Sequence, residues 1–414
     1  MGEGDESWGQ SFLPPMANPP GTVGNDFFLS TADPFDLING LLGVDTVSYA
    51  LATSGVSVDL SLAGFQSVGG GLGSDQLVSI ENLIGTRFND TLRGNSGANE
   101  LSGGLGSDLL RGSAGNDLLN GGDGVDTADY SGLGGPVRLG AFGALFKGAL
   151  GTDQLVGIEK IIGSSGAGDT IDHSGAVAPA LGTSTDLRSG AVTVRGLIAP
   201  LPLSFSVSQF ENVIGSGFAD TIEGNGGTNT LNGGAGIDTL TYAGATAGVR
   251  VSLATTLAQN TLGDGVDTVS NFENLTGSRF NDTLTGNLGN NVLSGGLGAD
   301  VLTGGLGADV FRYQSVQDSG LAAADRITDF RSLQFDRIDL SAIDANVFAA
   351  GDQAFTWRVS PLPIINPPVA LAVGELGFNT IGGNSFVYGR TSASADFKLQ
   401  LDGVSTLNAS QFVL

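Results

Sequence analysis

Aspartate and asparagine residues recur at one fixed place in short glycine-rich segments of this chain. These segments share the nine-residue pattern G-G-x-G-x-D-x-U-x, in which U is a large apolar residue. Carboxylate and backbone carbonyl oxygens are the ligands that Ca²⁺ prefers, and glycine lets a backbone approach an ion closely. The residue types and their spacing therefore predict turns that bind Ca²⁺.

The nonapeptides occur in three uninterrupted runs, 85–129, 215–241 and 277–312, with single units at 21–29 and 70–78. In each unit the last three residues form a short strand whose U side chain points inward, because side chains alternate along a strand. Two nonapeptides then make one coil of 18 residues with a turn at each edge. Stacked coils should form two parallel sheets around a thin apolar core.

Turns on the same edge of such a stack are 18 residues apart, so an ion between them should contact the Asp of one unit and the Asp two units later. The ligands predicted on an edge that carries only Asp are Asp90, Asp108, Asp126, Asp220, Asp238, Asp282 and Asp300. Those predicted on the opposite edge are Asn99, Asp117, Asn291 and Asp309, and the single units add Asp26 and Asp75. Asn229 has no predicted partner. We expect tighter sites on the all-Asp edge. The alternative is that these side chains only stabilise turns through hydrogen bonds to the backbone.

The composition excludes several other functions. The 414 residues include 68 Gly, 33 Asp and nine Glu, and the net charge is −25. This charge repels phosphate backbones and argues against a nucleic-acid partner. The chain has no Cys and a single His, which excludes disulfides, thiolate zinc sites and sites with two His ligands. No apolar run reaches the ~18 residues of a transmembrane segment.

A longer repeat encloses the nonapeptides. It places a Tyr four residues after an Asp, at Tyr49, Tyr130 and Tyr242, and a Glu six residues after another Asp, at Glu81, Glu159 and Glu273. We interpret the chain as a disordered segment 1–20, a β-roll module 21–129, a degenerate solenoid or inserted region 130–214, further β-roll modules 215–312 and a C-terminal domain 313–414.

The nonapeptides resemble the RTX, or haemolysin-type, calcium-binding repeat. Residues 308–414 include Asp325-Arg-Ile-Thr-Asp329-Phe330 and resemble the C-terminal domain of serralysin-type metalloproteases. The resemblance implies an all-β fold, a right-handed parallel β-roll or β-solenoid with a β-sandwich-like C-terminal domain, and Ca²⁺ as cofactor. It also implies export by a type I (ABC) secretion apparatus that reads the C-terminus. Residues 1–20 lack the basic and apolar regions of a signal peptide, which fits that route. Gln411 departs from the family, which usually has Asp there.

Catalytic motifs of the protease are absent, since the sequence has neither H-E-x-x-H nor G-x-S-x-G. His173 lies beside Asp172 and Ser174, but a turn position explains it better than a catalytic triad. We therefore expect a non-enzymatic, secreted or cell-surface-associated bacterial calcium-binding protein with a structural or adhesive role, and with a cell-surface or matrix polysaccharide as a candidate partner. The alternatives are a secreted hydrolase or epimerase built on 130–214, and the non-catalytic remainder of a larger RTX enzyme.

Overall fold

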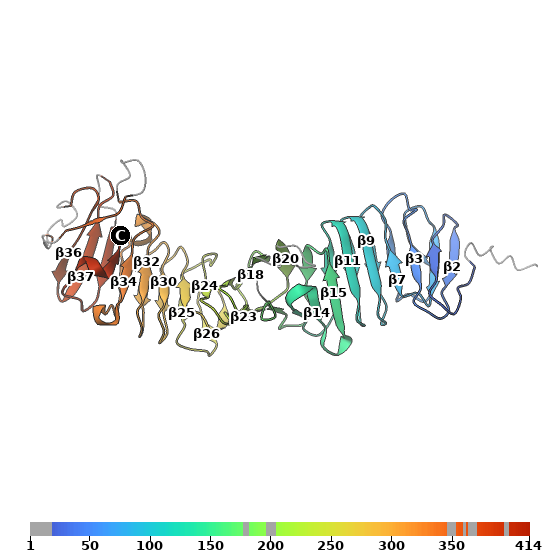
Figure 1. Cartoon of the computed structure of the whole chain (residues 1–414), viewed down its shortest axis with the longest axis horizontal. Coiled ribbons are helices and arrows are strands. Elements are labelled where there is room, and N and C mark those ends of the chain that lie inside the picture. Colours follow the sequence, from blue (N-terminus) through green and yellow to red (C-terminus); the bar gives the residue numbers. More distant parts are fainter. Residues whose placement is uncertain are drawn as a thin grey trace, which may run out of the picture. The chain divides into compact units, whose positions relative to one another are not determined.

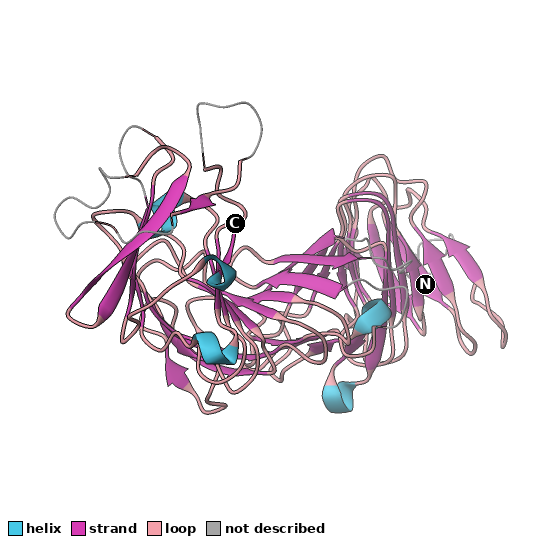
Figure 2. Ribbon diagram, turned by 60° about the vertical axis from the view of Figure 1, so that its left-hand side comes forward, coloured by secondary structure: helices cyan, strands magenta, loops and turns pink. Residues whose placement is uncertain are grey.

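The computed structural model describes residues 19–176, 182–195, 204–345, 353–358, 362, 371–392 and 397–414. Residues 1–18 of the predicted disordered segment 1–20 therefore lie outside the described residues. The described residues form two compact units, one within 19–137 and 143–166 and the other within 138–142, 167–195 and 204–414. Both units consist of short strands joined by turns (Figures 1 and 2).

The first unit contains three sheets of mostly parallel strands. The first consists of β1 (Phe27–Leu29), β3 (Thr46–Ser48), β7 (Asn82–Ile84), β9 (Glu100–Gly106), β11 (Leu118–Gly124), β15 (Thr152–Val156) and β14 (Ala144–Phe146). The second consists of β4 (Ser57–Asp59), β8 (Thr91–Arg93), β10 (Leu109–Arg111), β12 (Thr127–Asp129) and β16 (Lys160–Ile162). The third consists of β2 (Phe35–Asn39), β6 (Ser74–Val78) and β5 (Gln66–Ser67).

Strand register in the first unit follows the nonapeptide period. Leu110 of β10 pairs with Leu92 of β8 and with Ala128 of β12, so neighbours in the sheet are separated by two nonapeptides. The U side chains point inward, and Leu92, Leu101, Leu110 and Leu119 are fully buried. Burying each such leucine stabilises the roll by about 1.5–3 kcal/mol. Figure 1 shows β3, β7, β9 and β11 side by side in chain order (blue to cyan), which confirms the predicted β-roll.

The second unit repeats this arrangement. Its first sheet consists of β13 (Arg138–Leu139), β17 (Thr170–Asp172), β21 (Asn212–Ile214), β23 (Thr228–Asn232), β27 (Val266–Ser270) and β26 (Gln259–Asn260). Its second sheet consists of β20 (Ser204–Ser208), β19 (Ala191–Arg195), β18 (Gly182–Asp186), β22 (Thr221–Glu223), β24 (Thr239–Thr241), β28 (Asn274–Thr276), β30 (Val292–Ser294), β32 (Val310–Arg312), β34 (Arg337–Asp339) and β39 (Phe412–Val413).

The C-terminal residues continue two sheets of this roll. The third sheet consists of β25 (Arg250–Ser252), β29 (Thr283–Thr285), β31 (Val301–Thr303), β33 (Asp325–Ile327), β38 (Phe397–Leu401), β37 (Asn384–Gly389), β36 (Glu375–Ile381) and β35 (Thr356–Trp357). Strands β33 and β34 pair in parallel with β31 and β32, and β36, β37 and β38 form an antiparallel meander. The described chain thus ends in a β domain that extends the nonapeptide stack.

Helices in the described residues are single 3-10 turns (cyan in Figure 2). They are η1 (Ala141–Gly143), η2 (Gly148–Leu150), η3 (Val316–Ser319), η4 (Ser332–Gln334) and η6 (Ala409–Gln411). Across the described ranges, therefore, no helix has the length and apolarity that crossing a membrane requires.

Candidate metal centres

The predicted ligand pairs are in contact along the edges of the rolls. In all six pairs the backbone N–H of the first residue donates to Oδ1 of the Asp that follows 18 residues later, as from Asp90 to Asp108 at 2.7 Å. The other pairs, at 2.7–2.9 Å, are Asp108 with Asp126, Asn99 with Asp117, Asp220 with Asp238, Asp282 with Asp300 and Asn291 with Asp309. Each turn is thus connected to the turn above it by a carboxylate.

Within the three nonapeptide runs, the second carboxylate oxygen of five predicted ligands has no hydrogen-bond partner. These oxygens are the Oδ2 atoms of Asp108, Asp126, Asp238, Asp300 and Asp309, and none of the five residues is more than 2% exposed. A buried charged oxygen without a partner is costly unless a cation compensates it. These five oxygens are therefore the atoms of the predicted sites that best fit a metal ion.

Glycine at the first position of the unit leaves room for such an ion. A Cβ atom on Gly103 would collide with Asp108 Oδ2 and with the carbonyl oxygen of Gly121. A Cβ atom on Gly233 would likewise collide with Asp238 Oδ2 and with the Asn271 carbonyl oxygen. Carboxylate and carbonyl oxygens thus converge beside each glycine, which is the donor set of Ca²⁺. No group of three or more acidic or His side chains in the described ranges is placed to hold a metal, so carbonyl oxygens would complete the coordination.

The first Asp of each run differs, because a hydroxyl residue in the second position of its unit satisfies the carboxylate. Thr86 donates its N–H to Asp90 Oδ2 at 2.6 Å and its hydroxyl to Oδ1 at 3.0 Å. The equivalent pairs are Ser216 with Asp220, Ser278 with Asp282, and Thr22 with Asp26. The sequence signal was Thr or Ser where the later units of the all-Asp edge have Gly. It marks turns in which the protein itself supplies the donors.

Asparagine residues satisfy the first turn of the opposite edge in a similar way. Asn99 accepts the N–H of Asn95 at 2.8 Å and donates its amide to the Glu81 carbonyl oxygen at 2.8 Å. Asn291 makes the same two bonds with Asn287 and Glu273. A neutral amide brings its own donor, so these turns need no cation.

Asn229 has a partner, contrary to the expectation from the 18-residue spacing. Its N–H donates to Asp267 Oδ1 at 3.3 Å, 38 residues further along the chain. The wider coil between them includes strand β26, which pairs antiparallel with β27, and the extra residues of this hairpin change the spacing. Residue counting at the nonapeptide period therefore missed the contact.

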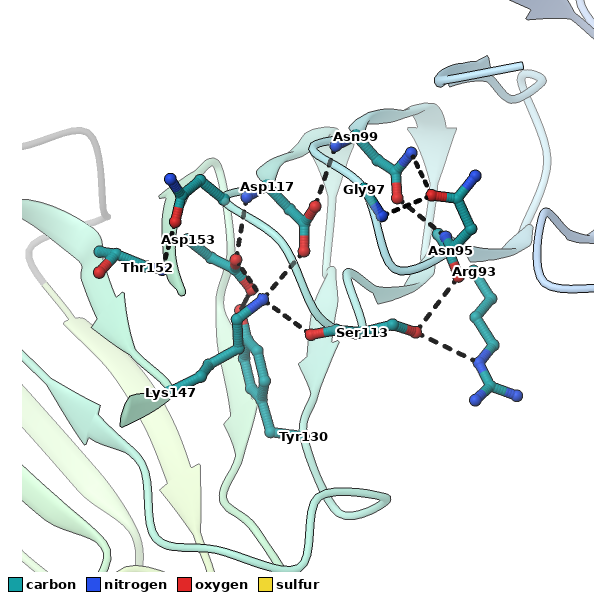
Figure 3. A network of polar contacts seen from close by, with 12 residues as sticks. Arg93, Asn95, Gly97, Asn99, Ser113, Asp117, Tyr130, Lys147, Thr152 and Asp153 are labelled. Carbon is teal, nitrogen blue, oxygen red and sulfur yellow. Dashed lines mark hydrogen bonds and ion pairs between the residues drawn. The ribbon is translucent and has the colours of Figure 1, made fainter. Parts of the chain in front are cut away.

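Asp117 and Asp75 lie at comparable wider coils. Asp117 Oδ2 accepts a hydrogen bond at 2.9 Å from the ammonium group of Lys147, a fully buried residue that sequence reasoning did not single out (Figure 3). Asp75 is opposite Asp36 in the register of the strands, a pair that the nonapeptide spacing did not predict.

The Tyr residues of the long repeat donate hydrogen bonds to the Asp residues of these wider coils. Tyr49 donates to Asp75 Oδ2 at 3.0 Å. Tyr130 and Tyr242 donate in the same way to Asp153 and Asp267.

The repeated Glu residues close the module ends. Glu81 Oε2 accepts the backbone N–H of Asp45 at 2.9 Å. Glu159 and Glu273 accept those of Asp126 and Asp238 at 2.8 Å. Each Glu thus takes the place that an Asp occupies within a run. The I-E-N and F-E-N repeats were the sequence signal for this role.

His173 is buried, and its Nε2 lies 3.1 Å from the hydroxyl of Thr185. Burial lowers the pKa of His173 to about 4, so the ring is neutral at physiological pH. This hydrogen bond to a threonine on β18 is the packing of a structural histidine.

Burial raises the pKa values of the stacked carboxyl groups. Asp108 reaches a pKa of about 6, first because it is buried and then because the charges of Asp90 and Asp126 lie near. Burial and the charges of Asp220 and Glu273 raise the pKa of Asp238 to about 6. For Asp300, burial raises the pKa to about 8, with the charge of Asp282 contributing. Ionising these groups at neutral pH without a cation therefore destabilises the fold.

We predict that calcium binding changes when a carboxylate with a free oxygen is substituted, and stays the same when a carboxylate that Thr or Ser caps is substituted. Asp108→Asn should lower the number of bound Ca²⁺ ions and the stability in calcium by about 1–3 kcal/mol, since a charged ligand is lost. In calcium-free buffer the same variant should be at least as stable as the wild type, because a buried charge has gone. Asp90→Asn is the matched control and should keep the calcium number, which equilibrium dialysis measures. Equal calcium losses in the two variants would contradict the assignment.

The calcium-free chain should become more stable as pH falls. A carboxyl group whose pKa is raised in the fold binds its proton more tightly than in the unfolded chain, where the Asp pKa is about 3.9. Its contribution is fully present below pH ~4 and is lost as pH rises through about 6 for Asp108 and about 8 for Asp300.

Thermal unfolding followed by circular dichroism in resin-treated buffer should therefore give a higher Tm at pH 5 than at pH 8. Saturating Ca²⁺ should remove or reverse this difference, because protons and Ca²⁺ compete for the same oxygens. A calcium-free chain with the higher Tm at pH 8 would show that the stacked carboxyl groups do not control stability.

Comparison with known proteins identifies the repeats. A family model of the RTX calcium-binding nonapeptide repeat matches four segments, residues 79–110, 102–131, 208–240 and 276–311. No curated protein matches the chain. Among solved structures, one subunit of a mannuronan C5-epimerase from Azotobacter vinelandii is 25% identical, with a TM-score of 0.27 over 40% of this chain and 88% of that one.

Two further structures show similarity of the same order. Another subunit of that epimerase is 24% identical, with a TM-score of 0.20 over 47% of this chain and 77% of its own. The extracellular lipase of Serratia marcescens is 14% identical, with a TM-score of 0.25 over 79% of this chain and 40% of the lipase. At these TM-scores the solved structures share only limited structural similarity with this chain. The family model and the stacked Asp turns agree, and this chain therefore carries the RTX calcium-binding nonapeptide repeat.

Proposed function

We propose that this chain is a secreted calcium-binding protein that folds when Ca²⁺ fills its turns, and that its role is structural or adhesive. The observation that carries the proposal is the set of buried carboxylate oxygens without partners, on Asp108, Asp126, Asp238, Asp300 and Asp309. These residues would hold the ions together with carbonyl oxygens of the glycine turns. Calcium would supply the positive charge that compensates these five buried carboxylates.

Electrostatics couples this binding to folding. The net charge of −25 opposes compaction, and the stacking of coils brings carboxylates close together. An ion that binds only the folded turns adds its binding free energy to the stability of the fold. Extracellular modules bind Ca²⁺ with Kd values of about 10⁻⁴–10⁻³ M, so such sites fill outside the cell and stay empty in the cytosol. The chain would accordingly fold after export.

A structural or adhesive role accords with the character of the repeats. The nonapeptides are calcium-binding elements, and their repeated geometry serves the stacking of turns. His173 is used in packing. A regular array of acidic turns with bound Ca²⁺ would present a surface suited to an anionic polysaccharide of the cell surface or matrix, which is the partner class we favour.

Removal of calcium should lower the Tm so far that the chain unfolds at a temperature at which the calcium-bound chain is folded. At that temperature far-UV circular dichroism in a chelator should show little β-structure, and millimolar Ca²⁺ should restore it. Mg²⁺ should restore it poorly, because Mg²⁺ requires octahedral coordination at shorter distances. Equal β-structure in chelator and in calcium would overturn the coupling of folding to calcium.

Export should depend on the C-terminal residues while they are still unfolded. In the fold β39 pairs with β34, and the ring centroids of Phe412 and Trp357 lie 4.8 Å apart, so a signal there is covered once the domain has formed. Deleting the last ~50 residues should retain the protein inside a host that carries a type I exporter. Deleting residues 1–20 should not.

The variant Asp108→Asn separates failed export from failed folding, because it weakens calcium-dependent folding and leaves the C-terminus intact. It should still be exported. Efficient export of the C-terminally truncated chain would refute the proposed route.

A further inference from the structure

Lys147 places a positive charge inside the first unit. Its side chain is fully buried, and its Nζ lies 2.9 Å from Asp117 Oδ2, 2.5 Å from Asp153 Oδ1 and 2.8 Å from the Ser113 carbonyl oxygen (Figure 3). The other oxygen of Asp153 accepts the hydroxyl of Tyr130 at 2.9 Å. Two carboxylates and one carbonyl oxygen thus surround an ammonium group where neighbouring turns leave an oxygen free.

The same position recurs in two other wide coils. Each coil has an antiparallel hairpin strand, β5, β14 or β26, and the register pairs Gln66, Leu145 and Gln259 with Asp75, Asp153 and Asp267. Two residues after these strand residues lie Val68, Lys147 and Thr261. Their backbone N–H groups donate to the carbonyl oxygens of Gly73, Gly151 and Gly265, in each case two residues before the Asp. Val68, Lys147 and Thr261 are therefore structural equivalents.

The coil with Thr261 has one carboxylate at this position, and its other buried carboxylate, Asp264, forms an ion pair with Arg188. The residue opposite Asp267 is the neutral Asn229. Both oxygens of Asp267 have donors, the backbone N–H of Asn229 and the hydroxyl of Tyr242. A single carboxylate with two donors costs less to bury than two adjacent carboxylates, so this position does not require an ammonium group.

The coil with Val68 has two carboxylates and lacks the ammonium group. Asp36 and Asp75 face each other in the register of β2 and β6, and both residues are fully buried. Asp36 Oδ2 accepts the N–H and the hydroxyl of Thr31, at 3.2 and 2.9 Å. Asp75 Oδ2 accepts the hydroxyls of Ser30 and Tyr49, at 2.8 and 3.0 Å. Oδ1 of each residue has no partner.

The sequence around this pair offers no basic side chain. The first 86 residues contain ten Asp and Glu residues and no Lys, Arg or His. The first basic residue is Arg87, whose guanidinium lies 5.0 Å from the centre of the Phe88 ring. Two buried carboxylates with unpartnered oxygens are therefore left with an uncompensated negative charge, which is costly in a protein interior.

We propose that Asp36 and Asp75 hold a Ca²⁺ ion at the position that the Lys147 ammonium group occupies between Asp117 and Asp153. All available donors are oxygens, which favours Ca²⁺ over transition metals. The site lies outside the three nonapeptide runs, although Asp75 belongs to the single unit 70–78, and its second carboxylate, Asp36, is in no nonapeptide. Each of the two coils buries a pair of carboxylates. A bound ion would compensate the pair Asp36 and Asp75, and the ammonium group of Lys147 compensates the pair Asp117 and Asp153.

Exchanging the two residues tests this proposal on the full-length chain. Val68→Lys should place an ammonium group between Asp36 and Asp75 and lower the bound Ca²⁺ by about one ion per chain. Lys147→Val should raise it by about one ion per chain, and should lower the Tm far more in calcium-free buffer than in calcium. Equilibrium dialysis in millimolar Ca²⁺ measures the number of bound ions, and thermal unfolding with and without Ca²⁺ measures the Tm.

Asp36→Asn keeps the test valid if Val68→Lys fails to fold, because it removes the charge with almost no change in shape. It too should bind about one ion fewer per chain. Full calcium binding by Asp36→Asn, or a Lys147→Val variant equally destabilised with and without calcium, would overturn the proposal. Each variant is compared with the wild type, so the measured change in bound Ca²⁺ reports on this site alone. The test is therefore independent of whether the three nonapeptide runs bind Ca²⁺.

Discussion

The hydrogen bond from the backbone N–H of one turn to the carboxylate of the turn above it is the interaction on which the rest of this structure depends. It connects successive coils along the edge and places one Asp or Glu side chain at each step, as from Asp90 to Asp108 and from Asp108 to Asp126. The bond uses only one of the two carboxylate oxygens. Every step of the stack therefore buries a charge that something else must compensate.

The chain compensates this charge in several chemically distinct ways. Thr86 caps Asp90 with an amide and a hydroxyl at the start of a run. Asn99 replaces the carboxylate by a neutral amide. Lys147 provides an ammonium group to Asp117 and Asp153. The remaining carboxylates within the runs keep a free oxygen beside a glycine. These turns belong to the RTX repeat, which is a calcium-binding repeat. The dependence on calcium is thus concentrated in particular turns.

This distribution has a consequence for folding. Turns compensated by protein groups can form before calcium arrives, since a hydroxyl, an amide or an ammonium group is always present. Turns with a free oxygen, such as those of Asp108 and Asp300, gain their full stability only with a cation. The raised pKa values of these two groups express the same cost, because burial and neighbouring charges disfavour their ionised form. Either a proton or a Ca²⁺ ion can therefore remove the repulsion between the stacked carboxylates.

The sequence by itself determined the β-roll, its inward-facing leucines and the pairs of turns within each run. A strict period of nine leaves only one register in which glycine turns and apolar strands both repeat, so Asp90 had to lie below Asp108. Only the tertiary structure decided the contacts across the wider coils. Asp117 meets Asp153 after 36 residues and Asn229 meets Asp267 after 38, because hairpin strands of different length interrupt the period. The position of Lys147 between two carboxylates, and of Val68 at the same place beside Asp36 and Asp75, follows from strand pairing between distant segments, which no local pattern encodes.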